Sequence, residues 1–127
     1  MIQVEKLQLN HYYFKEKMEN PDKVVEFLLK NASKYAKAKS ERIYIEEFRK
    51  SKKALLMQIA QVKGVETMAA QERDAYANAE YQELLKGLRD AVEVEETLRW
   101  QLIAAQLKVD IWRTEQANNR FIDKGIA

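Results

Sequence analysis

The sequence predicts an all-α protein: an elongated, coiled-coil-like antiparallel helical hairpin with a short connector helix and an N-terminal helical segment, assembled into an oligomeric bundle. Three observations predict this class. The 127 residues include only three glycines and one proline, and 33% are charged, which is typical of long helices. Apolar residues recur every three or four positions across 78–120, as in an amphipathic helix. The same period runs through 40–63, so the two segments are predicted to pack on each other.

The first 20 residues (1–20) are predicted to form an arm that precedes a single helical domain over 21–127. Apolar residues alternate in part between Ile2 and Leu9, but no second strand is evident to pair with such a strand. We therefore interpret the arm as irregular or partly helical. Its aromatic cluster, Tyr12 to Phe14, is expected to dock on the bundle or on a second subunit.

The first long helix is predicted to begin at Asn20-Pro21-Asp22, because asparagine caps helices, proline suits the first helical position and aspartate favours the positive end of the helix dipole. No further proline or glycine precedes Gly64. The helix formers around residue 38 favour one helix, bent near residue 40, over two helices separated by a cap at Ser40. The seam of its second half is predicted to comprise Ile45, Phe48, Leu55 or Leu56, Ile59 and Val62.

The connection between the two long helices is predicted from the residues that end one helix and begin the next. Gly64 is expected to end the first helix, as glycine often does. Thr67 is expected to cap a connector helix that runs to Tyr76, and Asn78 to cap the second long helix. The chain then reverses, so the two long helices are predicted to pack antiparallel.

The second long helix carries two apolar rows in its C-terminal half. One contains Leu98, Leu102, Ala105, Val109 and Trp112, and the other contains Trp100, Ile103, Leu107 and Ile111. A helix that is apolar on two faces is buried on two sides. Residues 98–112 are therefore expected to lie inside a bundle that one short chain cannot complete, and the protein is predicted to be a homo-oligomer.

Glu95 interrupts this pattern, because it stands where Val92 and Leu98 predict an apolar residue. It either pairs with a base on the facing helix and fixes the register, or lies at the edge of the seam in solvent. If the turn is centred near residue 70, Arg49 is the candidate partner.

The composition argues against catalysis, and we expect no enzyme, no cofactor and no metal. Cysteine is absent and His11 is the only histidine, whereas a carboxylate-bridged di-iron bundle needs two Glu-x-x-His motifs. Gly64 and Gly87 stand alone, so no phosphate-binding loop is present. No apolar run is long enough to span a bilayer and the start does not resemble a signal peptide, so a cytoplasmic protein is expected.

Charge is unevenly distributed, with a balance of +6 over residues 1–63 and −4 over 64–127. The basic residues of the first long helix could meet the phosphates of a nucleic acid, and a solvated helix face is the alternative interpretation. The candidate nucleic-acid contacts are Lys37, Lys39, Arg42, Arg49, Lys50 and Lys53. The candidate partner-binding residues are Tyr76 and Tyr81 near the hairpin tip, and Arg113 and Arg120, one heptad apart.

Four segments also carry a family resemblance over about residues 32–121. They are Tyr35-Ala36-Lys37-Ala38-Lys39, Glu47-Phe48-Arg49-Lys50…Lys53-Ala54, Glu72…Ala75-Tyr76-Ala77…Tyr81, and Ala104-Ala105…Trp112-Arg113…Ala117…Arg120. In spacing and residue type the chain resembles small helical, uncharacterised proteins of tailed phages and prophages that are encoded among recombination genes. The resemblance implies an accessory role on DNA or on a recombinase, and it carries over no catalytic residue.

Together these features predict a non-enzymatic phage accessory protein in DNA recombination or replication that binds DNA through a basic helix face. The alternative is a helical adaptor that binds a recombinase, a single-strand binding protein or a host protein without touching nucleic acid. An inhibitor of a host enzyme is a further alternative, and it would need no basic face. The salt dependence of binding distinguishes DNA binding from an apolar protein interface, because phosphate contacts weaken steeply as the salt concentration rises.

Overall fold

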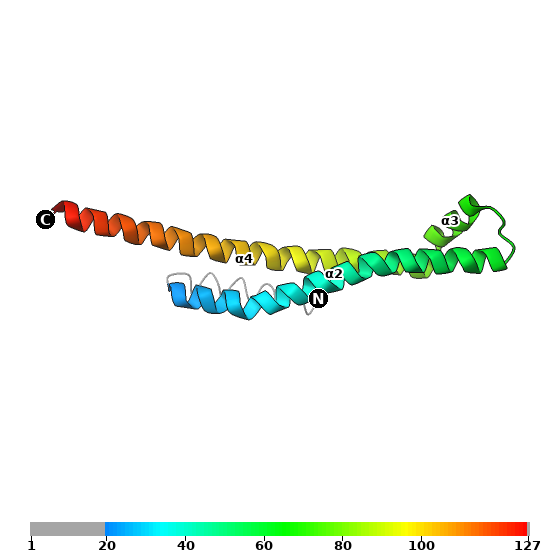
Figure 1. Ribbon diagram of the computed structural model, residues 1–127, viewed down its shortest axis with the longest axis horizontal. Helices are drawn as coiled ribbons and strands as arrows, with labels where there is room; N and C mark the ends of the chain where they lie inside the picture. The colour runs from blue at the N-terminus through cyan, green and yellow to red at the C-terminus, as the bar shows by residue number, and fades with distance from the viewer. Residues whose placement is uncertain (1–19, 127) are drawn as a thin grey trace. The chain divides into compact units, whose positions relative to one another are not determined.

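The computed structural model describes residues 20–126, and every element in that range is helical (Figure 1). The helices are α2 (Pro21–Val62), α3 (Met68–Ala77) and α4 (Ala79–Ile126). The predicted all-α class is therefore confirmed for the described residues. Apart from Asn20, the predicted N-terminal arm lies outside them.

Helix α2 begins where its sequence predicts. The Asn20 side-chain oxygen accepts a hydrogen bond from the Asp22 amide at 3.0 Å, and Pro21 is the first helical residue. Ser40 does not start a second helix, because its hydroxyl donates to the Lys37 carbonyl at 2.8 Å within the continuous helix. The favoured interpretation, one helix up to residue 62, is confirmed.

Gly64 ends α2 in the way that the sequence predicts. Its φ is 99°, in the left-handed region that favours glycine. The Gly64 amide donates to the Gln61 carbonyl and the Val65 amide donates to the Ala60 carbonyl, each at 3.0 Å. This pair of bonds is the Schellman motif, which satisfies the last carbonyls of a helix and turns the chain away.

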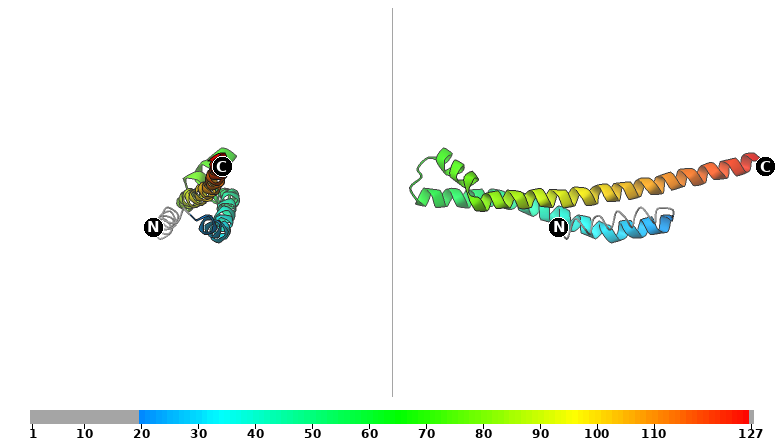
Figure 2. Two further views of the ribbon diagram at one scale, coloured as in Figure 1. Left: turned by 90° about the vertical axis from the view of Figure 1, so that its left-hand side faces the viewer. Right: turned by 180° about the vertical axis from the view of Figure 1, so that it is seen from behind.

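Two side-chain caps then place α3 and α4. The Thr67 hydroxyl accepts from the Ala70 amide at 3.2 Å, and the Asn78 side-chain oxygen accepts from the Glu80 amide at 2.8 Å. Asn78 alone separates α3 from α4. Viewed from behind in Figure 2, α3 doubles back next to the end of α2, where the Lys53 ammonium lies 3.0 Å from a Glu72 carboxylate oxygen.

The chain divides into two compact units, and α2 and α4 contribute to both. The first contains residues up to 36 and from 96 onward. Its buried core is Val24 and Phe27 of α2 with Ala105 of α4. Partly buried Leu28, Leu102 and Val109 pack against that core.

The second unit, residues 37–95, takes residues from all three helices. Leu56 of α2, Ala75 of α3 and Tyr81 of α4 form its buried core, with Met57 and Leu85 packed against it. Its ion pairs run in opposite order along the chain: Arg42 meets Glu95, and Lys52 meets Glu80. Within this unit α2 and α4 are therefore antiparallel.

The predicted seam of α2 is wrong for most of its members. Leu56, one of the two alternatives at that turn, is buried, but Leu55, Ile59 and Val62 are 52%, 49% and 88% exposed. The buried row uses Ala60 instead. Helix α2 therefore carries two apolar rows in this unit: the row with Leu56 packs against α3 and α4, and the row with Leu55, Ile59 and Val62 is exposed.

The second apolar row of α4 is also uncovered by the described chain. Leu98 and Ala105 of the first row are buried, whereas Trp100, Leu107 and Ile111 of the second are 59%, 56% and 50% exposed. The expected burial of 98–112 on two sides is therefore not met within one chain. The physical reason is that the only other described helix of this unit, the start of α2, can cover a single face of α4.

Candidate nucleic-acid interface

An open hollow in the second unit is lined by some of the predicted nucleic-acid contacts and by some of the predicted partner-binding residues. Its volume is about 470 Å³. We call it the tyrosine–lysine pocket, and it is lined by Arg49, Lys50 and Lys53 of α2, Tyr76 of α3, and Tyr81, Gln82 and Leu85 of α4. Basic residues and tyrosines that are far apart in sequence therefore share one concave surface.

Helix periodicity explains why the three bases of α2 meet there. Residues three and four apart lie on one helix face, so Arg49 and Lys50 both neighbour Lys53. Lys50 lies 3.2 Å from a Glu47 carboxylate, and both side chains of this pair are largely exposed; such a pair exchanges readily for another anion. Arg49 makes no ion pair with another residue of 20–126. Two cations are thus available to an incoming anion.

Lys53 has a different role, because it is engaged inside the pocket. Its ammonium lies 3.0 Å from a Glu72 oxygen and 4.7 Å from the centre of the Tyr76 ring, a cation–π geometry. The Tyr76 side chain and then the Glu72 carboxylate raise the pKa of Lys53 above its ordinary value. Lys53 therefore stays charged and holds α3 against α2.

The two tyrosines are placed edge to face. Their ring centres are 5.4 Å apart at an angle of 61°, a favourable aromatic geometry. Tyr81 is 5% exposed and belongs to the core, whereas Tyr76 is 40% exposed. The Gln82 side chain donates to the Tyr76 carbonyl at 2.7 Å and so closes the α3–α4 connection. Tyr76 is thus an exposed aromatic ring on a fixed backbone.

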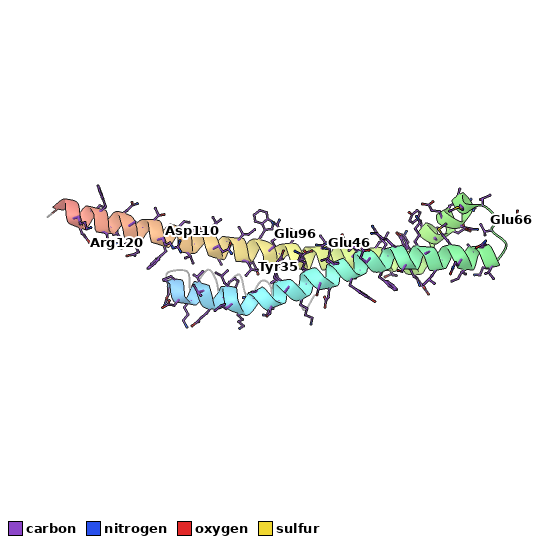
Figure 3. The ribbon with its side chains drawn as sticks, in the orientation of Figure 1. Tyr35, Glu46, Glu66, Glu96, Asp110 and Arg120 are labelled. Atoms are coloured by element: carbon purple, nitrogen blue, oxygen red, sulfur yellow. The ribbon has the colours of Figure 1, made fainter. Side chains whose placement is uncertain are left out.

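Arg42 belongs to a separate, partly buried ion pair. Its Nε and one terminal nitrogen donate to the two carboxylate oxygens of Glu95 at 2.6 and 3.0 Å, and its other terminal nitrogen donates to Glu46 at 2.8 Å. Figure 3 labels Glu46 on α2. The hydrogen bonds that Arg42 donates to Glu95, and then the one to Glu46, raise its pKa. With two carboxylates on one guanidinium, Arg42 has no excess positive charge to offer a phosphate.

Glu95 itself is 6% exposed, so the solvated alternative is wrong and the expected pairing with a base is confirmed. The expected partner, Arg49, is wrong. The observed partner, Arg42, lies seven residues before Arg49, which is about two helical turns. The pairs Arg42–Glu95 and Lys52–Glu80 show that the chain reverses earlier than a pairing of Arg49 with Glu95 would need, so the residue of α2 opposite Glu95 also comes earlier.

The remaining predicted residues are exposed but do not line the pocket. Lys37 and Lys39 lie at the start of the second unit with exposed side chains. Arg113 and Arg120 are exposed on α4 in the first unit. Arg113 lies 3.9 Å from Asp110, and the Arg120 Nε donates to the Gln116 carbonyl at 3.4 Å; Figure 3 labels Asp110 and Arg120.

Sequence reasoning did not identify Glu72, Gln82 or Leu85 as parts of this site. Glu72 reaches Lys53 of α2 from α3, and Gln82 reaches the Tyr76 carbonyl of α3 from α4, across the one-residue connection at Asn78. The two caps at Thr67 and Asn78 were the available signal, since they fix the length of α3.

No group of three or more acidic or histidine side chains within 20–126 could hold a metal ion. None of the helices in this range has the length and apolar character needed to cross a membrane.

Comparison with known proteins adds no relative: no protein-family profile, no curated sequence and no solved structure matches this chain.

Proposed function

We propose that this protein is a non-enzymatic phage accessory protein in DNA recombination or replication, working in the bacterial cytoplasm and binding nucleic acid through the tyrosine–lysine pocket. One observation carries the proposal: Arg49, Lys50 and the exposed ring of Tyr76 converge on one open hollow. The sequence resemblance suggests the pathway, and the chemistry of the pocket suggests the ligand.

Each pocket residue has a role in this proposal. Arg49 and Lys50 bind phosphates, because neither is held in a buried ion pair. Tyr76 offers a surface on which a base stacks, an interaction worth about 1–3 kcal/mol per base in single-strand binding proteins. Lys53 orients Tyr76 rather than binding phosphate. Arg42, one of the predicted contacts, is left out because Glu95 and Glu46 neutralise it.

This division of roles favours single strands over duplexes. A duplex presents phosphates to such a surface and keeps its bases stacked inside, whereas a single strand offers both phosphate and base. Lys37 and Lys39 add exposed positive charge earlier on α2, where a strand leaving the pocket could continue.

We also propose that α2 and α4 form one antiparallel helical hairpin and that the protein is a homo-oligomer. The hairpin is supported by contacts inside each unit, which join early residues of α2 to late residues of α4 and late residues of α2 to early residues of α4. The oligomer is supported by the large apolar side chains that one chain leaves exposed on both helices.

The test is fluorescence anisotropy of labelled single- and double-stranded DNA at low and moderate salt. The variant Arg49→Glu/Lys50→Glu is compared with Arg73→Glu/Lys86→Glu, which changes the net charge equally at exposed positions outside the pocket. Circular dichroism verifies that both are folded. We expect tighter binding to the single strand, lost in the pocket variant and kept in the control.

The salt dependence identifies the kind of contact. For single strands, each phosphate contact contributes about 0.7 to the slope of log K against log salt, so removing two contacts should lower that slope by about 1.4. Absence of binding at low salt would reject the nucleic-acid proposal. The helical adaptor would then be the better account, with binding of a recombinase or single-strand binding protein that salt hardly weakens.

A further inference from the structure

The outer face of α2 in the second unit carries a line of exposed apolar side chains, which we call the α2 stripe. It consists of Tyr44, Phe48, Leu55, Ile59 and Val62. Tyr44 is 67% and Phe48 38% exposed, and their rings stack at 5.9 Å with 10° between their planes. The stripe is separate from the row that contains Leu56 and Ala60, which is buried.

The spacing of the α2 stripe is that of a helix-packing surface. Its positions repeat after 11 residues: Tyr44 is followed by Leu55, and Phe48 by Ile59. An 11-residue period is close to the natural repeat of an α-helix, so such a line stays on one face for its whole length. The occupant that fits a straight apolar line is another helix.

Flanking charges indicate which helix. Glu41 lies beside one end of the stripe and Lys63 beside the other, and both side chains are exposed. Lys63 keeps the helical path, because its amide donates to the Ile59 carbonyl at 3.1 Å. At roughly 100° per residue, Glu41 lies in line with Ile59 at one edge of the stripe, and Lys63 lies about 40° farther round on the same side. Lys52, which falls between them, is paired with Glu80 of α4.

This arrangement is complementary to itself in one orientation. If two copies pack antiparallel, residues on the same flank of each helix meet across the interface, so Glu41 of each copy lies near Lys63 of the other. A twofold axis makes both contacts equivalent. In a parallel pair, each flank meets the opposite flank of its partner at the same level, and these ion pairs do not form.

We infer that a second copy of this chain covers the α2 stripe, with the two α2 helices antiparallel and Tyr44 of one copy next to Val62 of the other. The inference rests on the homo-oligomer proposed above, whose interface it specifies, and does not depend on nucleic-acid binding. Around α2, Lys50 and Lys53 lie about 140–160° and Arg49 about 115° from the middle of the stripe. The tyrosine–lysine pockets of both copies therefore stay open in the dimer.

Cysteine cross-linking tests the inference directly, because the chain contains no cysteine. Tyr44→Cys and Val62→Cys proteins, one of them carrying a mass tag, are oxidised mildly, alone and mixed. We expect a disulfide-linked dimer of the two different variants in the mixture, and little linking of either alone. Lys86→Cys, at an exposed position of α4, measures the background from random collisions.

Each other outcome contradicts a defined part of the inference. Efficient linking of each variant with itself would mean a parallel pair. No linking above the Lys86→Cys background, together with a monomer mass in sedimentation velocity of the unmodified protein at every concentration, would overturn it. A dimer that forms without these cross-links would place the interface elsewhere.

Charge reversal gives an independent test that leaves the apolar stripe unchanged. Glu41→Lys and Lys63→Glu each place like charges together at both ends of the interface, so each should raise the dimer Kd roughly threefold or more. The double variant should restore it. Ile59→Lys, at a site 49% exposed in one chain, should give a folded monomer. A dimer unaffected by Ile59→Lys would overturn the inference.

Discussion

The two units join their helices by different interactions. In the described part of the first unit, α2 and α4 share an apolar core of Val24, Phe27 and Ala105, and the buried Asn31 side chain donates to the Phe27 carbonyl of its own helix at 2.8 Å. The ion pairs among its described residues join neighbours on the same helix, as Arg99 and Glu96 do at 2.8 Å. Such pairs stabilise a helix by a few tenths of a kcal/mol and do not select a facing partner.

In the second unit, ion pairs connect different helices. They are Arg42 with Glu95, Lys52 with Glu80, and Lys53 with Glu72. Apolar burial is non-directional, so it does not fix how two helices are aligned. A charge in a partly buried ion pair does, because sliding one helix along the other would leave that charge without its partner. The comparison indicates that packing supplies stability in the first unit, and that charge pairs select the register in the second.

The largest expected effect sharpens the first half of this comparison. Phe27→Ala removes a side chain that is 5% exposed, and such core truncations cost about 3–5 kcal/mol. Leu29→Ala, two residues later and 74% exposed, should change the free energy of unfolding by less than about 0.5 kcal/mol. Urea denaturation followed by circular dichroism measures both. Equal losses would mean that apolar packing does not dominate the first unit.

A smaller effect is expected from the charge pairs that select the register in the second unit. Arg42→Gln removes the base that pairs with the buried Glu95 carboxylate, whereas Glu95→Gln leaves Arg42 with the Glu46 carboxylate. Both single variants should be destabilised, Arg42→Gln more strongly. The double variant Arg42→Gln/Glu95→Gln should lose less than the sum of the two, because each single variant already breaks the bond between Arg42 and Glu95. Urea denaturation of all four proteins completes the cycle. Additive losses would show that Arg42 and Glu95 do not stabilise the protein as a pair, and therefore that they do not select the register.

The comparison also explains how far the sequence could predict the structure. Helix starts and ends were predictable, because Asn20, Gly64, Thr67 and Asn78 act on backbone groups within a few residues. That Glu95 pairs with a base was predictable too, since a carboxylate within an apolar pattern needs a partner.

What could not be predicted depends on contacts between helices. The choice of Arg42 over Arg49 follows from how α2 and α4 are aligned, and the local pattern does not contain that information. The same limit applied to α2, where Leu55 and Leu56 are neighbours in sequence but only Leu56 is buried. A helix with two apolar rows does not reveal which row its own chain covers. The tyrosine–lysine pocket likewise required the α3–α4 turn to be known.

The smallest expected effect concerns the more exposed charge pairs of the second unit at low pH. Lys53, followed by Tyr76, lowers the pKa of Glu72 below its ordinary value of 4.5, and Lys52 lowers that of Glu80. Below the ordinary value, the unfolded chain therefore binds protons that the folded chain still excludes. The stabilisation is present above pH 4.5 and is lost as the pH falls through the lowered pKa values.

Acid titration of the thermal midpoint measures this effect. Between about pH 5 and pH 3 the unmodified protein should lose stability, and Glu80→Gln should show a shallower decline because one of the two linked groups is gone. Glu66→Gln is the matched control: Glu66 is exposed in the connector after α2 (Figure 3) and makes no ion pair with another described residue. Both pairs are partly exposed to solvent, so the difference should be small and should shrink further as salt screens it. An identical acid response in Glu80→Gln and the unmodified protein would mean that the Lys52–Glu80 pair forms without stabilising the unit, leaving the Arg42–Glu95 pair as its main charge-based register contact.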